Sequence, residues 1–264
     1  MTALALLSTE GEGFDAPGSE DFELPPLFTI AGFEVTKVTL LVVASVILIG
    51  AFFYLAARRG SLVPGRLQFA GEGAYRFIRN QLGRDIIGSA DFMTFVPFLV
   101  TLFFFVLINN IFGIVPLLQF PTMSHIGFPA ALAGLSFVVY NTVGIRRHGF
   151  VNYFKDTMFP PGVPKPVYVI LSPIELMTIL FTRPLTLALR LFANMFAGHL
   201  LLLVFILGGE YMLQSGGFAA ILSPFAFGFG VVLTFFELLV QVLQAYIFTL
   251  LSSLYIAGAL AEEH

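Results

Sequence analysis

Arg190 is the residue whose type and place most strongly indicate chemistry. It lies within LTLALRLFANMFAGHLLLLVF, where only His199 offers another titratable side chain. An arginine at mid-membrane costs ~2.5–3.5 kcal/mol on insertion scales, so it persists where it faces protein, water or a carboxylate. A guanidinium keeps its proton in proteins, so Arg190 can attract a carboxylate but cannot relay a proton. A snorkelling structural arginine is the alternative, although Arg190 lies 20 residues from Ile170 and 17 from Leu207.

A second polar feature is a stripe on one helix face near the C-terminus. Its members are Gly230, Thr234, Glu237, Gln241 and Gln244, spaced at i, i+4, i+7, i+11 and i+14. In an apolar run such a stripe needs an interior polar path. We therefore expect a hydrated pathway, and the alternative is that Glu237 is a protonated structural acid.

Helical spacing relates the other polar residues to Arg190. At ~100° per residue, Asn194 lies on the same side and His199 lies about 180° away. Glu175 would lie about 60° away and ~22 Å towards one membrane side if the helix were continuous. Glu175 and His199 are therefore candidates for two separate proton paths.

Antiparallel pairing of the two polar segments brings further residues to a common depth. It predicts Gln244 near the level of Arg190, and Glu237 near His199. A histidine and a glutamate in proximity can exchange protons near neutral pH. Two ligands are too few for a metal site, so we expect neither a metal ion nor a cofactor.

Charge-free runs define the elements that must position these residues. A membrane helix needs ~20 apolar residues. Two runs are far longer, at 38 and 43 residues, and would reach ~57 and ~65 Å as helices against a hydrocarbon core of ~30 Å. Each is either a hairpin of short helices or one steeply tilted helix, and we favour the latter, antiparallel, with one turn at Gly208, Gly209, Gly216 and Gly217. The expected spans are Val38–Ala57, Phe92–Pro116, Ile126–Ile145, Ile170–Leu207 and Phe218–Leu260.

The expected fold is therefore an all-α membrane protein with about five transmembrane helices, the last two long, steeply tilted and antiparallel. Residues 37–264 form a single transmembrane helical domain. Within it, Arg66–Arg84 mixes arginines with large apolar residues, which favours an interfacial helix over the alternative of a plain loop. Residues 1–36 carry seven acidic residues and no Lys or Arg before Lys37, and they are expected to form a flexible acidic tail.

Composition excludes several classes of protein. The 264 residues are 58% hydrophobic and 11% charged, whereas soluble domains average ~25% charged. Mean hydropathy is +0.92, which argues against a soluble enzyme. A net charge of −3 leaves no basic footprint for nucleic acid, and the absence of Cys excludes disulfides and thiolate nucleophiles.

Lys and Arg counts predict orientation. Ten cations follow the first and third spans, against Lys37 alone on the opposite side. Cytoplasmic loops are enriched in such cations. We therefore expect the N-terminus outside and the C-terminus in the cytoplasm. The ten residues are Arg58, Arg59, Arg66, Arg76, Arg79, Arg84, Arg146, Arg147, Lys155 and Lys165.

Several motifs resemble subunit a of F-type ATP synthases. They are RPLTLALRLFANMFAGHLL (Arg183–Leu201), LLVQVLQAYIFTLLSSLYIAGALAEEH (Leu238–His264), PGRLQ (Pro64–Gln68), INNIFGIVP (Ile108–Pro116) and SPIEL (Ser172–Leu176). The likeness covers residue 38 to the end. It implies a multi-pass subunit of a bacterial cell membrane, not catalytic by itself, that carries protons in ATP synthesis with c-ring and b-type peripheral stalk partners.

The resemblance also implies roles for individual residues. Arg190 would be the stator arginine that faces the c-ring carboxylate, and Asn194 and Gln244 match polar positions near it. His199 and Glu237 match the outer half-channel, where some bacterial members exchange the two residue types. Glu175 lies near the inner half-channel acid, whereas a family aspartate falls on Gly113, which receives no proton role.

Two other classes remain open. A secondary proton-coupled transporter would have internal repeats and a mid-membrane substrate site, and the two halves show no repeat. An assembly or scaffold protein would need neither Arg190 nor the polar stripe.

Overall fold

The computed structural model describes residues 17–18, 27–30, 33–58, 60, 63–88, 91–115, 118, 120–159 and 164–261. Within these ranges, five helices are long and apolar enough to cross a membrane, as expected. Most of the acidic tail lies outside the described residues. Its last part forms two short antiparallel strands, β1 (Phe28–Ile30) and β2 (Phe33–Val35), which pair immediately before the first helix.

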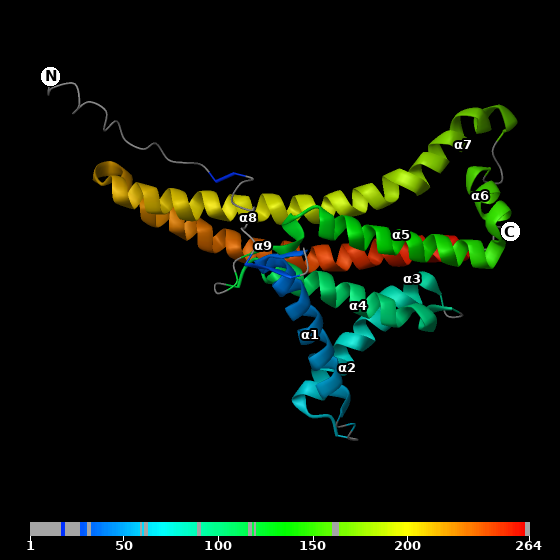
Figure 1. The fold of residues 1–264 in the computed structure, drawn as a ribbon, viewed down its shortest axis with the longest axis horizontal. Helices are drawn as coiled ribbons and strands as arrows, with labels where there is room; N and C mark the ends of the chain where they lie inside the picture. Colours follow the sequence, from blue (N-terminus) through cyan, green and yellow to red (C-terminus); the bar gives the residue numbers. More distant parts are fainter. Residues whose placement is uncertain are drawn as a thin grey trace.

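The first helices form a hairpin that returns to the bundle (Figure 1). Helix α1 (Lys37–Arg58) is followed by α2 (Arg66–Phe77), a π-helical segment η2 (Ile78–Arg84) and the short α3 (Asp85–Ile87). The segment expected at the interface is thus helical, and the loop alternative is wrong. It packs against α1, α4 (Phe92–Ile111) and α9 (Gly217–Leu260); its place at the membrane surface stays a prediction.

The centre of the chain supplies the third membrane helix and a connecting layer. The 3₁₀ turn η3 (Thr122–Ser124) precedes α5 (Gly127–His148), which ends at Gly149 with a φ of 83°. Helix α6 (Phe150–Met158) and the 3₁₀ turn η4 (Lys165–Val167) then lead into α7 (Tyr168–Met177).

The last two membrane helices are long and antiparallel. Helix α7 continues through a π-turn, η5 (Thr178–Thr182), into α8 (Arg183–Ser215), which makes a run of 48 residues. Within this run α8 packs antiparallel to the 44 residues of α9. Pro173 and Pro224 lie inside helices without ending them. At ~1.5 Å per residue, both helices exceed a hydrocarbon core of ~30 Å and must tilt steeply.

The turn between α8 and α9 is shorter than expected. Gly216 and Gly217 have φ values of 69° and 59°, which glycine adopts without strain. Gly208 and Gly209 lie within α8 instead, so their assignment to the turn is wrong. A Cβ on Gly209 would lie 3.3 Å from Phe227 and Ala226, so this glycine permits close helix packing rather than reversal.

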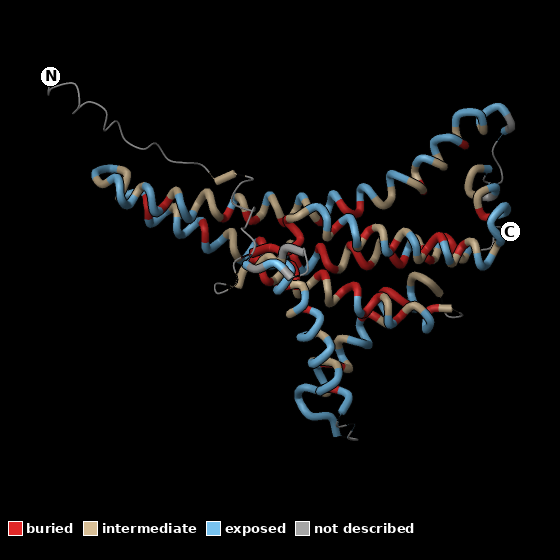
Figure 2. The backbone as a smooth tube through the Cα atoms, viewed as in Figure 1, coloured by how far each residue is buried: buried red, intermediate tan, exposed pale blue. Residues whose placement is uncertain are grey.

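The core lies where α9 packs against α4, α5 and α8 (Figures 1 and 2). Phe248 of α9 is 0% exposed and belongs to a cluster with Val96 and Leu99 of α4 and Leu191 of α8. The outward surfaces of the helices stay apolar and exposed, which suits lipid contact. This core fixes the register of α8 against α9, on which the functional residues lie.

Candidate functional site

The polar stripe on α9 faces α8, as its spacing predicts. Glu237, Gln241 and Gln244 are 5%, 0% and 2% exposed. Gly230 is also buried and Thr234 is half-buried, its hydroxyl donating to the carbonyl of Gly230. The stripe is therefore an interior polar row in an otherwise apolar helix.

Glu237 holds the centre of this row. Its Oε1 accepts a hydrogen bond from Gln241 Nε2 at 3.2 Å, and its Oε2 is buried without a hydrogen-bond partner among the described residues. A buried carboxylate oxygen normally has a partner. Among the described residues, Gln241 is therefore the hydrogen-bond partner of this carboxyl group.

Glu237 also touches α8 one residue from His199. A Cβ on Gly198 would lie 3.3 Å from Glu237 Oε1, so the backbone of α8 passes directly beside the carboxylate. His199 follows in sequence and is 8% exposed. The expected common depth of Glu237 and His199 is confirmed.

Gln244 lies near the level of Arg190, as expected. Asn194 Nδ2 donates to Gln244 Oε1 at 2.7 Å, and Asn194 follows Arg190 by four residues on α8. Packing of the small residues Gly198 and Gly209 against α9 sets this register, and helical rise alone does not specify it.

Arg190 points away from the buried row. It is exposed on α8, whereas His199 is buried on the same helix, which confirms the predicted difference in direction. Arg190 makes no ion pair or hydrogen bond with any residue that the structure describes. Charged residues within membrane-spanning segments pair with other groups or face a water-filled cavity.

Arg183, seven residues before Arg190, is bound differently. Its guanidinium carbon lies 5.3 Å from the ring centroid of Tyr255, over the ring. This cation–π contact gives Arg183 a partner within the chain, which indicates a structural role.

Glu175 is half-buried on α7, beyond the π-turn from Arg190. The expected angle of about 60° between them assumed a continuous α-helix and is wrong, because an i→i+5 turn contains an additional residue and rotates α7 against α8. The sequence around this turn, with Pro184 after it and a threonine at each end, did not predict a π-turn.

A buried polar group on α4 was missed as a candidate. Asn110 Nδ2 donates to the carbonyl of Gln241 at 3.3 Å, and Asn109 Nδ2 donates to Ser45 Oγ at 2.9 Å. Thr122 Oγ1 in turn donates to Asn109 Oδ1 at 2.8 Å. Two adjacent asparagines in an apolar membrane run were the signal that could have identified this group.

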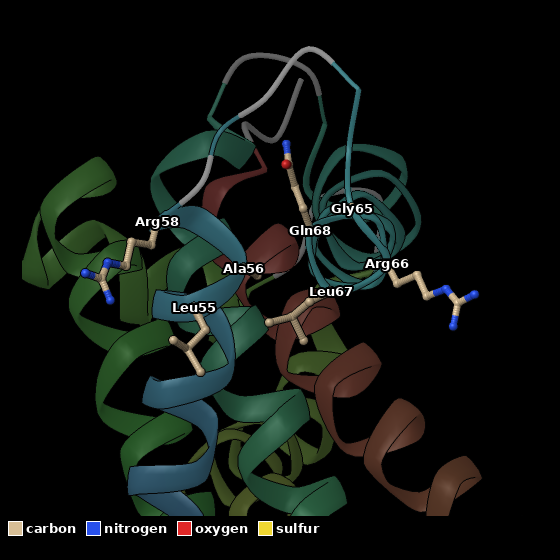
Figure 3. Close-up of a pocket in the computed structure, with 7 residues that line it drawn as sticks. All are labelled: Leu55, Ala56, Arg58, Gly65, Arg66, Leu67 and Gln68. Atoms are coloured by element: carbon tan, nitrogen blue, oxygen red, sulfur yellow. The ribbon is translucent and has the colours of Figure 1, made fainter.

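A pocket between α1 and the start of α2 lies apart from these residues (Figure 3). Its two cations, Arg58 and Arg66, point outwards in opposite directions in that view. They do not converge on one ligand, so this pocket is a weaker candidate site than the interface of α8 and α9.

Comparison with known proteins identifies the family. Residues 38–257 match the family described as ATP synthase A chain. The chain is 50% identical to ATP synthase subunit a of Nocardioides sp. (strain ATCC BAA-499 / JS614), covering 100% of this chain and 99% of the relative. It is 44% identical to the subunit of Pseudarthrobacter chlorophenolicus, covering 100% of both chains, and 41% identical to that of Streptomyces lividans, covering 97% and 91%. With a buried polar row, an exposed membrane arginine and relatives matched along their full length, this chain belongs to the ATP synthase subunit a family, the proton-translocating membrane subunits of that complex.

Proposed function

We propose that this chain supplies two aqueous half-channels and a stator arginine, Arg190, to a rotary ATP synthase. The observation that carries the proposal is the division of polar residues between two directions. Arg190 is exposed without a partner among the described residues, whereas His199, Glu237, Gln241 and Gln244 are buried between α8 and α9. The exposed cation is available to another subunit, and the buried row is available to a proton.

The outer half-channel would use Glu237 and His199. Glu237 Oε2 lies without a hydrogen-bond partner among the described residues, and Gln241 orients the other oxygen. A proton received there passes to a carboxylate of a c-ring subunit, which becomes neutral and can rotate into lipid. Asn194 and Gln244, joined by a hydrogen bond, would line the path between Glu237 and the ring.

The inner half-channel would use Glu175. After nearly a full rotation the ring carboxylate approaches Arg190 from the other side. The fixed positive charge favours the ionised carboxylate, so the proton is released towards Glu175. Each charge that crosses the membrane gains ~2.3 kcal/mol per 100 mV, which ring rotation transmits to the nucleotide-binding subunits.

The remaining partners follow from the same proposal. The c-ring would contact the face of α8 that bears Arg190, and b-type peripheral stalk subunits would hold the chain still against the rotating ring. The N-terminus would lie outside and the C-terminus in the cytoplasm.

Replacement of Arg190 tests the proposal. Arg190→Ala should abolish ATP synthesis and ATP-driven proton pumping in assembled complexes, while passive proton leak persists or rises because the barrier between the half-channels is lost. Arg190→Lys should fail as well, because a desolvated lysine can lose its proton. Coupled synthesis at the normal rate in either variant would contradict the proposal.

A further inference from the structure

The joint between α7 and α8 is a π-turn, Thr178–Thr182. Such turns are uncommon and are often found at functional sites. Here the turn lies between Glu175 and Arg190. Each residue of an α-helix turns by ~100°, so the additional residue of an i→i+5 turn rotates α7 by about that angle relative to α8. The joint therefore determines the direction in which Glu175 points.

A tyrosine from a neighbouring helix binds the joint. The Tyr140 hydroxyl, on α5, donates to the carbonyl of Ile179 at 3.0 Å, and Tyr140 is 1% exposed. Ile179 lies inside the π-turn, where the regular i→i+4 pattern is interrupted. A side-chain donor to such a carbonyl stabilises the interrupted pattern, because buried backbone groups require partners.

The Tyr140 ring also contacts a second aromatic residue, Tyr255, which in turn contacts the joint. It makes an edge contact with Tyr255 of α9, with centroids 5.5 Å apart. The Arg183 guanidinium lies over the other ring, Tyr255, at 5.3 Å. Arg183 is the first residue after the π-turn. One aromatic pair, from α5 and α9, thus contacts the joint at both Ile179 and Arg183.

Few contacts outside the joint orient α7. Helix α7 packs chiefly against α6, whereas α8 packs against α5 and α9. Figure 1 shows α7 rising away from α5, and Figure 2 shows its residues as exposed or half-buried except Ser172. Because the bundle core does not pack closely against α7, the rotation of α7 depends mainly on the geometry of the π-turn.

We propose that Tyr140 is a positioning residue for the inner half-channel: its hydroxyl holds the π-turn, and the π-turn directs Glu175 towards the proton path. Tyr140 acts through the backbone and does not itself exchange protons. The inference rests on the role proposed for Glu175, and it adds a residue and a structural element on which that role depends.

The test uses Tyr140→Phe, which keeps the ring and its contact with Tyr255 but removes the hydrogen bond. Single cysteines are placed at successive positions 168–177 of this Cys-free chain, and their reaction with N-ethylmaleimide is measured in the assembled complex. In the parent chain Ser172 is 7% exposed, between Ile170 at 69% and Ile174 at 54%. Loss of the π-turn should move this pattern by about one position, a rotation of ~100°. An unchanged pattern, or a uniform rise in reactivity, would overturn the proposal.

Tyr153→Phe is the matched control. Tyr153 lies on α6, outside the membrane-spanning helices, and burial raises the pKa of its hydroxyl. Tyr153 packs in the same buried cluster as Tyr140 and Ile179, but its hydroxyl donates to Asn141 Oδ1 at 3.3 Å and not to a carbonyl of the π-turn. The labelling pattern should stay that of the parent chain, and the same shift in both variants would overturn the assignment to Tyr140.

Deletion of Leu180 provides a second variant. It removes the additional residue from the π-turn directly, so it should give the shifted pattern by itself. Tyr140→Phe should then add no further shift, as expected for two changes that act on one element. A further shift in the double variant would overturn the proposal.

Proton pumping, measured in membrane vesicles that carry the same variants, separates this inference from the proposed function. With a shifted pattern we expect pumping to fall about tenfold or more, as for a misplaced proton-transfer group. The labelling pattern does not depend on proton translocation, so failure of the shift overturns the inference on Tyr140 alone. A shift with normal pumping overturns the role of Glu175 and, with it, the functional part of the inference.

Discussion

Glu237 offers one carboxylate oxygen to Gln241, whereas its other oxygen is buried without a hydrogen-bond partner among the described residues. Removing a polar group from water is unfavourable unless a partner replaces the water. In a subunit that carries protons, we propose that Glu237 exchanges a proton through the oxygen that Gln241 does not bind. The adjacent position of His199 makes that residue the nearest candidate for the exchange.

Paired substitutions test whether Glu237 and His199 form one relay. His199→Ala and Glu237→Ala should each slow proton pumping by about tenfold or more. Glu237→Gln should also be impaired, because the amide keeps the shape but cannot titrate. Residues in one network give non-additive losses. The exchanged variant, His199→Glu with Glu237→His, should therefore recover more pumping than either single exchange, measured in inverted vesicles.

Independent behaviour would contradict the relay. Strictly additive losses without recovery in the exchanged variant would show that the outer path runs elsewhere. Assembly is checked in each case by the amount of complex that carries the c-ring.

Gly198 gives a steric prediction beside the same carboxylate. A Cβ here would lie 3.3 Å from Glu237 Oε1, so Gly198→Val should displace Glu237 and destabilise the contact between α8 and α9 by about 1–3 kcal/mol. We expect proton pumping to fall with it. Gly228→Val is the control, because a Cβ at Gly228 on α9 meets nothing within 4 Å. Equal pumping by the two variants would show that this contact has no functional importance.

At the scale of elements, the long apolar runs predicted the membrane helices because apolar length and flanking charge are local properties. The expected Val38–Ala57 corresponds to α1, Lys37–Arg58. The two π-helical segments could not be predicted, because an i→i+5 turn depends on tertiary partners such as Tyr140. The roles of the clustered glycines could not be predicted for the same reason. Gly216 lies at the chain reversal, whereas Gly209 permits close packing of α8 against α9. The sequence alone does not show which helix faces each glycine.

The site was predictable in part. The buried stripe on α9 and the common depth of Glu237 and His199 followed from helical periodicity. The pairing of Gln244 with Asn194 and the direction of Glu175 did not, because both depend on packing between helices. The hydrogen-bond partners of Asn109 and Asn110 lie in three other segments of the chain. Helical spacing within one segment could not predict these contacts.

The hairpin of α1 and α2 gives a prediction about stability. A Cβ on Gly71 would lie 2.6 Å from the Ala56 Cβ, so Gly71→Leu should force the two helices apart. We expect about 1–3 kcal/mol of destabilisation, measured as a lower thermal midpoint of the purified complex. Gly73→Leu, two residues further along the same helix, meets nothing within 4 Å and is the matched control. An equal midpoint for both variants would show that α1 and α2 do not pack in this way.

At the scale of the whole molecule, the bundle has two unequal parts (Figure 1). The antiparallel pair of α8 and α9 extends beyond the shorter helices, because 44 residues of α9 span ~66 Å as a helix. In a core of ~30 Å such helices must lie obliquely. An oblique pair can offer a long side to a curved partner, which agrees with the proposed contact with a ring.

Orientation decides which half-channel is the inner one. The segments that carry Arg58 and Arg146 should be cytoplasmic, since ten Lys and Arg residues follow the first and third spans and only Lys37 lies on the other side. We test this with single cysteines at Arg58, Arg146 and Gly18, a position where a Cβ meets nothing within 4 Å. A membrane-impermeant maleimide added to intact cells should label Gly18→Cys alone. Inverted vesicles should show labelling of Arg58→Cys and Arg146→Cys, and permeabilised cells should show all three. The reverse pattern would place the N-terminus inside, and the proton path through Glu237 and His199 would then open to the cytoplasm.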